Sequence, residues 1–229
     1  MKTSIIIPCY NEEKTIDKII NKILELRNLD LEIIIVDDCS TDSSKNIIET
    51  KLKDKVYRVI YNKINSGKGF SIRKGIAAAT GQIILIQDAD LEYDPNDYYK
   101  ILDLFKFGIA DVVYGSRFIG SEKKRVLYFW HTLGNKFLTL ISNIFTNLNL
   151  SDMEVGYKAF KSEIIKDMIL IEDRFGFEPE VTAKISKKNI KIYEVGISYF
   201  GRKYSEGKKI TWRDGFSAIR CIIKYNLFK

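Results

Sequence analysis

The sequence predicts an α/β protein with a central, mostly parallel sheet flanked by helices. Five short apolar runs alternate with four segments of helical periodicity in the first half of the chain, a pattern typical of βαβ units. Polar residues follow each run, and ligands of such sheets bind beyond the carboxyl ends of the strands. With 229 residues, 45% of them hydrophobic, the chain is expected to fold around one core.

The first two strands are expected over residues 3–8 and 31–36, which are rich in β-branched side chains. Between them, residues 11–13 offer a helix start, because apolar residues recur at helical spacing from 16 to 24. The second strand closes in Asp37 and Asp38, and residues 40–42 can cap a helix to about residue 52. Standing alone, this acidic pair suits a turn and cap as well as a binding site.

The third strand is expected over residues 56–60, and a glycine-flanked lysine, Lys68, follows it before a helix over residues 71–79. The spacing around Gly67 and Gly69 is not that of a P-loop, so ATPase activity is not expected. The two glycines would let backbone amides approach an anion. A helix over residues 98–107 and a strand over 111–114 continue the alternation.

The fourth strand is expected over residues 83–86 and is followed directly by acidic residues. Carboxylates follow it at Asp88, Asp90, Glu92 and Asp94. Unneutralised, they would repel one another and raise each other's pKa, and a divalent cation would remove that repulsion. Mg²⁺ or Mn²⁺ prefers such oxygens and keeps sites free for waters and phosphates, so the sequence predicts a metal–diphosphate site. Asp94 precedes Pro95 and is expected to cap a helix.

A different pattern begins after residue 117. Lys123, Lys124 and Arg125 precede an amphipathic helix expected over residues 126–148. Its apolar face consists of Val126, Trp130, Leu133, Phe137, Ile141, Ile144 and Leu148. Packing of this face against the core is one interpretation, and a segment lying in a membrane interface is the other. Helices over 177–186 and 211–227 and a strand around 192–195 complete the chain.

The composition of the chain indicates its cellular compartment and the class of its partner. Cys9, Cys39 and Cys221 are odd in number and widely spaced, which indicates a reducing compartment and argues against disulfides or a cysteine zinc site. Neither a signal peptide nor an apolar run of the roughly 18–20 residues that span a bilayer is evident. We therefore expect a cytoplasmic protein, peripheral on the cytoplasmic membrane face. The net charge of +7 is concentrated after residue 184, which suggests an anionic partner: a diphosphate, a lipid headgroup or nucleic acid.

Three motifs follow strands in order: residues 8–12 (Pro-Cys-Tyr-Asn-Glu), Asp37-Asp38 and Asp88-Ala89-Asp90. In this order and at these places they resemble glycosyltransferase family 2. Four later segments, residues 115–118, 152–158, 174–180 and 206–210, are similar to the branch that contains dolichol-phosphate mannose and glucose synthases. The resemblance extends from residue 2 to about residue 225.

The resemblance implies a Rossmann-like GT-A fold in one domain, residues 1–229, with amphipathic interfacial helices after the catalytic core. Residues 1–117 would bind the nucleotide sugar, and residues 118–229 would face the acceptor and the membrane. The implied reaction is inverting transfer of a hexose from a nucleotide-diphosphate sugar, of the UDP-glucose or GDP-mannose type, to a polyprenyl phosphate with Mg²⁺ or Mn²⁺. A separate membrane protein is a further partner to consider, and no nucleic acid is expected.

Site roles are also implied by motif position. The nucleoside would be held by Pro8, Tyr10 and Glu12, with Asp37 reading the base and Lys68 near the nucleotide. The metal would be bound by Asp88 and Asp90, with Glu92 a conditional third ligand because relatives often carry Gln there. The phosphates of donor or acceptor would be met by Arg117, Arg202 and Lys208. An acceptor phosphate is already ionised, so no strong general base is required, which fits a chain whose one histidine, His131, is expected to be structural or interfacial.

Two other functions fit parts of the sequence. A family 2 enzyme that glycosylates a sugar hydroxyl would need a carboxylate base, and Asp152 or Glu154 would be the first candidates. A non-catalytic module on membranes or nucleic acid would use the basic C-terminal third, but it would have no use for Asp37, Asp88 and Asp90. Glu178 and Glu180 are expected to be helix-start carboxylates favoured by the helix dipole, with a sugar-hydroxyl contact as the alternative.

Overall fold

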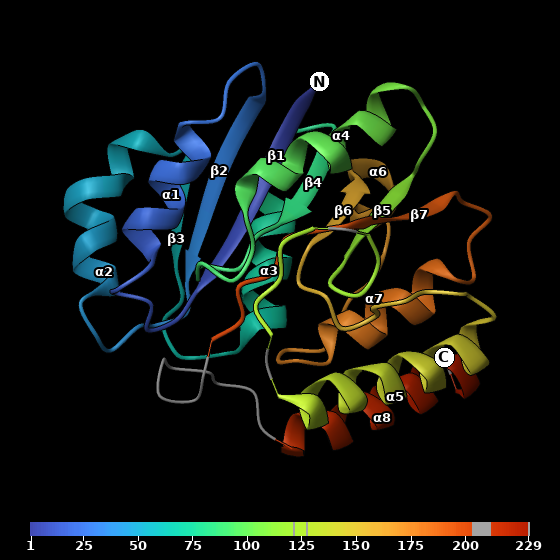
Figure 1. Cartoon of the computed structure of the whole chain (residues 1–229). Helices are drawn as coiled ribbons and strands as arrows, with labels where there is room; N and C mark the ends of the chain where they lie inside the picture. Colours follow the sequence, from blue (N-terminus) through green and yellow to red (C-terminus); the bar gives the residue numbers. More distant parts are fainter. Residues whose placement is uncertain (121, 127, 203–211, 229) are drawn as a thin grey trace.

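The structure is a computed structural model that describes residues 1–120, 122–126, 128–202 and 212–228. In these residues seven strands form one sheet in the order β3-β2-β1-β4-β6-β5-β7 (Figure 1). The strands are β1 (Lys2–Cys9), β2 (Asp30–Asp37), β3 (Arg58–Tyr61), β4 (Ile83–Ile86), β5 (Val112–Ser116), β6 (Lys158–Lys161) and β7 (Ile192–Gly196). Only β6 runs antiparallel to its neighbours in this sheet, so the mostly parallel α/β architecture expected from the sequence is confirmed.

The helices form two groups (Figure 1). Those beside the sheet are α1 (Ile16–Leu24), α2 (Ser44–Ile47), α3 (Lys68–Ala78), α4 (Tyr98–Lys106) and α6 (Ser162–Lys166). Short π and 3-10 turns cover Ile48–Leu52, Lys53–Lys55 and Pro95–Asp97. The second group, α5 (Phe129–Thr146), α7 (Phe177–Ile185) and α8 (Trp212–Leu227), packs together at one end of the molecule.

Several helices begin or end at other residues than expected, and a local contact explains the shift of α1. α1 begins at Ile16 rather than near residue 11, because the backbone of Glu12 donates to the hydroxyl of Ser44 at 2.8 Å and so belongs to the inter-strand loops. α3 begins at Lys68, three residues earlier than expected. Asp94 is confirmed as a cap, since its Oδ1 accepts from the backbone N–H of Asn96 at 3.1 Å.

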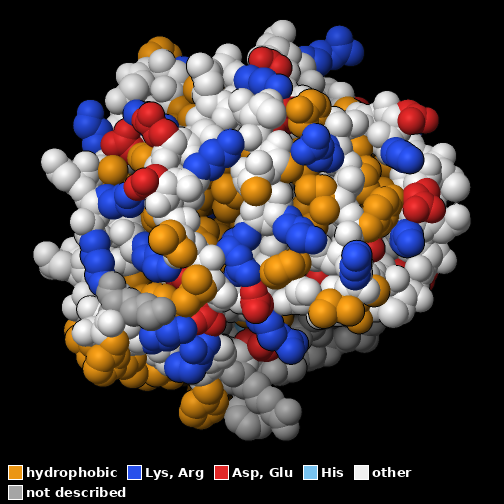
Figure 2. Space-filling model, turned by 180° about the vertical axis from the view of Figure 1, so that it is seen from behind, with side chains coloured by type: hydrophobic (Ala, Val, Ile, Leu, Met, Phe, Trp, Pro, Cys, Tyr) orange, Lys and Arg blue, Asp and Glu red, His pale blue; other side chains and the backbone are white. Residues whose placement is uncertain are grey.

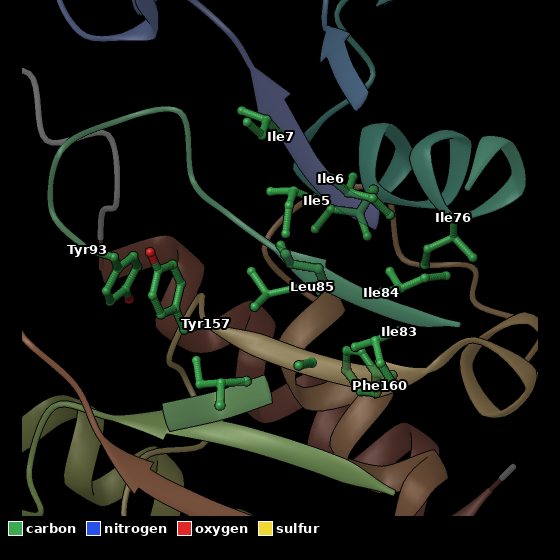
Figure 3. Close-up of a cluster of buried hydrophobic side chains, with 14 of the residues drawn as sticks. Ile5, Ile6, Ile7, Ile76, Ile83, Ile84, Leu85, Tyr93, Tyr157 and Phe160 are labelled. Carbon is green, nitrogen blue, oxygen red and sulfur yellow. The ribbon is translucent and has the colours of Figure 1, made fainter. Parts of the chain in front are cut away.

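The core lies on the central strands (Figure 3). Ile5, Ile6 and Ile84 are fully buried, and burial of each such side chain contributes roughly 1.5–3 kcal/mol. α3 approaches this layer closely at Gly75, where an added Cβ would clash with the side chain of Ile6. The β-branched runs read from the sequence are therefore the strands that hold the sheet between its helices.

β6 was not expected as a strand, and it decides which residues reach the functional edge of the sheet. It pairs antiparallel with both β4 and β5. Its first residue, rather than its last, therefore lies at the edge where the parallel strands end. Residues 152–157, which precede β6, are brought to the same edge as the residues that follow β1, β2, β4 and β5.

α5 buries its polar side and exposes its apolar side. Its buried residues are Thr139, Ser142 and Thr146, and the amide of nearby Asn143 donates to the carbonyl of Leu150 at 2.7 Å. The exposed residues Trp130, Leu133, Phe137, Leu140 and Ile144 lie at helical spacing, with exposed fractions from 46% for Leu133 to 75% for Trp130. We call these five residues the α5 apolar stripe. Of the apolar face expected from the sequence, Ile141 and Leu148 pack against the core, whereas the other residues of that face on α5 are exposed. Packing of this face on the core, one of the two interpretations of the sequence, therefore holds only in part.

α8 is attached to α7 by a small apolar cluster and by one carboxylate. Ala183 of α7 packs with Cys221 and Tyr225 of α8. Glu172 accepts hydrogen bonds from Arg220, Lys224 and Tyr225 at 2.7–2.9 Å. Among the described residues, no helix is long and apolar enough to traverse a bilayer.

The attachment of α8 should depend on pH through Glu172. Burial raises the pKa of its carboxyl, but the hydrogen bonds from Tyr225, Lys224 and Arg220 outweigh burial and lower the pKa from 4.5 to about 2. Because the folded state holds the ionised form, this stabilisation is present above pH 4.5 and is lost as pH falls toward 2. Glu172→Gln should lower the free energy of unfolding at pH 7 by about 1–2 kcal/mol.

The measurement is chemical denaturation of wild type and Glu172→Gln at pH 7 and pH 3, with exposed Glu25→Gln as the matched control. The difference between wild type and Glu172→Gln should shrink at pH 3, and Glu25→Gln should differ little from wild type at either pH. An equal difference at the two pH values would contradict the role of the ionised carboxylate.

Candidate active site

The ends of β1, β2, β4 and β5 and the start of β6 border a cavity of about 730 Å³. Of the residues singled out from the sequence, those that line it are Pro8, Tyr10, Glu12, Lys68, Asp88, Asp90, Glu92, Arg117 and Arg202. Asp37 is not among the described residues that line the cavity, and Lys208 lies outside the described residues. The structure thus brings residues from positions 8 to 202 into one site.

Asp37 and Asp38 have different surroundings. Asp38 lines the cavity and accepts from the amide of Asn62 at 2.7 Å and from the backbone of Ser66 and Gly67 at 2.9 and 2.7 Å. It therefore holds the loop that leads into α3. Asp37 is buried, and its Oδ1 has no hydrogen-bond partner among the described residues. Its role in reading a base stays a prediction.

Lys68, the first residue of α3, bridges two carboxylates. Its amine lies 2.8 Å from Asp88 Oδ1 and 3.0 Å from Glu178 Oε1. Burial lowers the pKa of this amine, but the charges of Asp88 and Glu178 outweigh burial and raise it. The amine is therefore a fixed positive charge beside the acidic end of β4.

The glycines that flank Lys68 serve chain packing. A Cβ at Gly67 would clash with the carbonyl of Asp173, and a Cβ at Gly69 would clash with the carbonyl of Glu172. Gly67 also has φ of +102°, which disfavours other residues. The sequence suggested that these glycines allow close approach of an anion, whereas the structure shows close approach of the chain's own segment at residues 172–174.

The guanidinium of Arg202 gathers the other carboxylates of the site. It lies 2.6 Å from Asp90, 3.1 Å from Glu12 and 3.3 Å from Glu92. Burial, followed by the charges of Glu92 and Asp88, raises the pKa of Asp90 even though Arg202 opposes the shift. Negative charge is thus in excess around Asp90, and an additional cation would relieve it.

The donor set fits a metal ion only in part. Among the described residues, no three Asp, Glu, His or Cys side chains are grouped so that they could hold a metal by themselves. Glu92 instead accepts from the hydroxyl of Tyr199 at 3.0 Å and from the backbone of Arg202 at 2.8 Å. Asp88 and Asp90 suit a Mg²⁺ or Mn²⁺ ion that completes its shell with diphosphate and water oxygens, as Mg²⁺ commonly does. The buried, charge-crowded Asp90 supports this fit.

A buried network of hydrogen bonds lies next to the acidic end of β4. Gln87, which precedes Asp88, accepts from the hydroxyls of Tyr98 and Tyr157 at 2.7 and 2.5 Å and donates to the carbonyl of Asp88 at 2.9 Å. Tyr157 also stacks on Tyr93 with ring centroids 4.6 Å apart (Figure 3). Gln87 directly follows β4 in the sequence, but its partner Tyr157 comes from a distant segment.

Arg117 is held by a buried carboxylate. Its Nε and Nη2 each lie 2.7 Å from an oxygen of Asp152, which is fully buried. Such a bidentate pair fixes both charges. Asp152 is therefore a partner of Arg117, and the suggested role of Arg117 toward phosphates stays a prediction.

Glu154 lines the cavity beside Glu178. Burial and then the charge of Glu178 raise the pKa of Glu154 to about 8, against the opposite effect of Lys158 and Arg117. Lys158 of β6 is fully buried and donates to the carbonyls of Met153 and Val155. Burial and the charge of Glu178 thus favour the protonated form of Glu154.

Two further residues have clear surroundings. Glu180 is fully buried and accepts from the backbone of Ile171 and Glu172 at 3.0 and 2.8 Å, so it is a structural carboxylate. His131 lines the cavity on α5, with its ring 5.4 Å from that of Tyr128.

Comparison with known proteins identifies the family. The model of the family "Glycosyl transferase family 2" matches residues 4–169. This chain belongs to glycosyltransferase family 2. The family expected from the strand-end motifs is confirmed.

Individual relatives extend over most of the chain. It is 27% identical over 211 residues to a dolichol-phosphate mannosyltransferase of Pyrococcus furiosus, which covers 91% of this chain and 59% of the relative. An uncharacterised protein of Methanocaldococcus jannaschii is 28% identical and covers 98% of this chain and 92% of its own length. The chain thus spans less than two thirds of the mannosyltransferase.

Solved structures share the fold. A glucosyl-3-phosphoglycerate synthase from Mycobacterium tuberculosis, in complex with Mn²⁺, UDP and phosphoglyceric acid, superposes with a TM-score of 0.76 at 17% identity, covering 100% of this chain and 79% of that one. TarS of S. aureus in complex with UDP-GlcNAc gives a TM-score of 0.63 at 20% identity, covering 98% and 66%. The GT-A fold is therefore confirmed.

Gly156 provides a test of the site geometry. An added Cβ would clash with Asp88 Oδ2 and lie 3.0 Å from the ring of Tyr93. Gly156→Ala should therefore turn Asp88 away from its present position. We expect roughly 100-fold weaker turnover, because a 1 Å misplacement in an active site can cost that much. Titration calorimetry with Mn²⁺ and UDP or GDP should show a parallel loss of affinity.

The matched control is Gly134→Ala on α5, where an added Cβ meets no heavy atom within 4 Å. This variant should bind as wild type and be slightly more stable, because alanine favours helix. Thermal unfolding distinguishes a displaced Asp88 from a damaged fold. Unchanged metal and nucleotide affinity in Gly156→Ala would contradict the placement of Asp88.

Proposed function

We propose that this chain is an inverting hexosyltransferase that uses a nucleotide-diphosphate sugar and a divalent cation to glycosylate a polyprenyl phosphate. The observation that carries the proposal is the two-sided character of the cavity. At the sheet edge it is lined by Lys68, Asp88 and Asp90, whereas α5 and α8 contribute Trp130 and Phe137, and Phe216 and Ile219. A charged end suits a diphosphate, and an apolar end suits a polyprenyl chain.

The relatives support this assignment. The Pyrococcus furiosus relative is named for transfer of mannose to dolichol phosphate, and the Mycobacterium tuberculosis neighbour contains UDP and Mn²⁺. On this basis residues 1–117 would form most of the donor side, and α5 and α8 would form the acceptor side.

The leaving group in this reaction is a nucleoside diphosphate, whose charge must be stabilised. Asp88 and Asp90 would hold Mg²⁺ or Mn²⁺, which when bound neutralises charge that develops on the diphosphate. Lys68 is a pre-positioned cation at the same place, and such fixed charges act most strongly on the transition state. Arg202 gives further positive charge next to Asp90.

The acceptor side favours an ionised phosphate over a sugar hydroxyl. A hydroxyl acceptor needs a general base, but Asp152 is fully buried and paired with Arg117. Burial and the charge of Glu178 raise the pKa of Glu154 and favour its protonated form. An acceptor phosphate requires neither residue as a base.

The direct test is incubation with Mn²⁺ or Mg²⁺, a panel of UDP- and GDP-sugars and a short polyprenyl phosphate, with extraction of the glycolipid. One donor should give product. Asp90→Asn should reduce kcat/KM by roughly 100-fold or more, because it removes a charge that holds the metal. Circular dichroism should show an intact fold.

Asp94→Asn is the matched control from the same stretch. Asparagine retains the capping geometry, and Asp94 does not line the cavity, so turnover should remain near that of wild type. Absence of glycolipid with every donor, or near-normal turnover of Asp90→Asn, would overturn the proposal.

We further propose that the α5 apolar stripe rests on a membrane surface. The stripe is exposed along the helix, and Trp130 and Phe137 belong both to it and to the cavity lining. Exposed Lys123, Lys124 and Arg125 precede the helix. Figure 2, which views the molecule from the side of α8, shows hydrophobic side chains with Lys and Arg side chains beside them at the end formed by α5, α7 and α8. Such a surface suits anionic lipid.

Vesicle binding tests this surface. A triple change of Leu133, Leu140 and Ile144 to Gln keeps helix propensity and leaves the cavity lining intact. It should weaken binding to anionic vesicles at low salt by at least about tenfold, since each apolar side chain that inserts contributes to affinity. The control is the same change at three exposed apolar residues elsewhere, Ile64, Phe107 and Ile169. Equal binding of the two triple variants would contradict the proposal.

A further inference from the structure

Two carboxyl groups in the cavity have oxygens that the described part of the chain leaves without a partner. These atoms are Glu154 Oε1 and Glu178 Oε2, and each is buried. Buried polar atoms in proteins are nearly always hydrogen-bonded, so an unpaired one needs an explanation. Both residues line the cavity, so a ligand there can supply the missing partners.

The two carboxyl groups lie next to the acidic strand end. The other oxygen of Glu178 accepts from Lys68, and the same amine binds Asp88. Glu178 and Asp88 are therefore separated by a single amine. If the diphosphate of a donor lies at Asp88 and Asp90, the sugar attached to it lies within reach of this pair.

The two groups also differ in chemistry. Glu178 accepts a hydrogen bond from Lys68 through Oε1 and presents Oε2 as a second acceptor. Glu154 is surrounded by Glu178 of α7, Lys158 of β6, Arg117 after β5 and Asp152 of its own loop, and burial together with Glu178 raises its pKa. A protonated carboxyl group both donates and accepts. Together the pair matches adjacent hydroxyl groups, each of which also donates and accepts.

We infer that Glu154 and Glu178 form a subsite that binds hydroxyl groups of the donor hexose. This inference rests on the proposed function and assigns the sugar-contacting residues of the same cavity. Asp152 is excluded from this subsite because Arg117 occupies its carboxylate, and Glu180 is excluded because backbone amides occupy its oxygens.

The experiment separates the sugar from the nucleotide. Titration calorimetry with Mn²⁺ compares UDP with UDP-glucose and GDP with GDP-mannose, and the ratio of the two affinities measures the sugar contribution. Glu154→Ala should lower nucleotide-sugar affinity roughly 5- to 20-fold and leave nucleoside-diphosphate affinity unchanged, as expected for lost hydrogen bonds. Glu154→Gln should retain most of the sugar contribution, because an amide also donates and accepts. Glu178→Gln should reduce it.

The pH profile distinguishes this role from a structural one. In wild type the sugar contribution should fall as pH rises from 7 through about 8, because Glu154 loses its donor proton. Glu154→Gln should show a flat profile, and any residual slope would report Lys158. If Glu154→Ala does not fold, the comparison of wild type with Glu154→Gln over pH 6–9.5 still shows whether the proton of Glu154 contributes to sugar binding.

The outcomes are distinct. If neither UDP nor GDP binds, the proposed function is overturned, and this inference with it. Normal diphosphate binding with an unchanged sugar contribution in Glu154→Ala would overturn only the inference. Reduced turnover with unchanged sugar affinity would also overturn it, because that result assigns Glu154 to the acceptor.

Discussion

The site depends on the balance of charge at the end of β4. Asp88, Asp90, Glu92 and Glu12 lie together in a partly buried place, where unpaired carboxylates repel one another. The chain places Lys68 against Asp88 and Arg202 against the other three. These cations come from α3 and from residue 202, so the charge balance joins distant parts of the chain. Even so, the pKa of Asp90 remains raised by burial and its acidic neighbours, which leaves the site receptive to another cation.

The antiparallel strand β6 brings a further segment of the chain to the cavity. It reverses the chain between β4 and β5, so residues 152–157 enter the same edge as the strand ends. Arg117 thereby meets Asp152, and Glu154 meets Glu178. The polar network of Gln87, Tyr98 and Tyr157 lies at the same junction. The hydrogen bonds to Gln87 and the candidate sugar contacts of Glu154 and Glu178 both result from the antiparallel direction of β6.

At the end of the molecule formed by α5, α7 and α8, polar groups are buried and apolar side chains are exposed. α5 satisfies the hydrogen-bonding groups of Thr139 and Asn143 inside the protein and leaves the α5 apolar stripe outside. Exposing so much contiguous apolar surface marks an interaction site. Because part of the stripe also lines the cavity, the surface that contacts lipid and the place of chemistry are continuous in our proposal.

The strands other than β6, the order of the strand-end motifs and the family were determined by the sequence, because β-branched runs and polar strand ends are local patterns. The helix over residues 126–148 was also recognisable from its periodicity, but periodicity does not state which face is buried. Only the tertiary structure decided that α5 turns its polar face inward, that Gly67 and Gly69 make room for residues 172–174, and that Asp38 rather than Asp37 lines the cavity. It alone paired Arg117 with Asp152 and Arg202 with Asp90. Such pairings join residues 35 to 112 positions apart, and no local pattern encodes a contact that the path of the sheet creates.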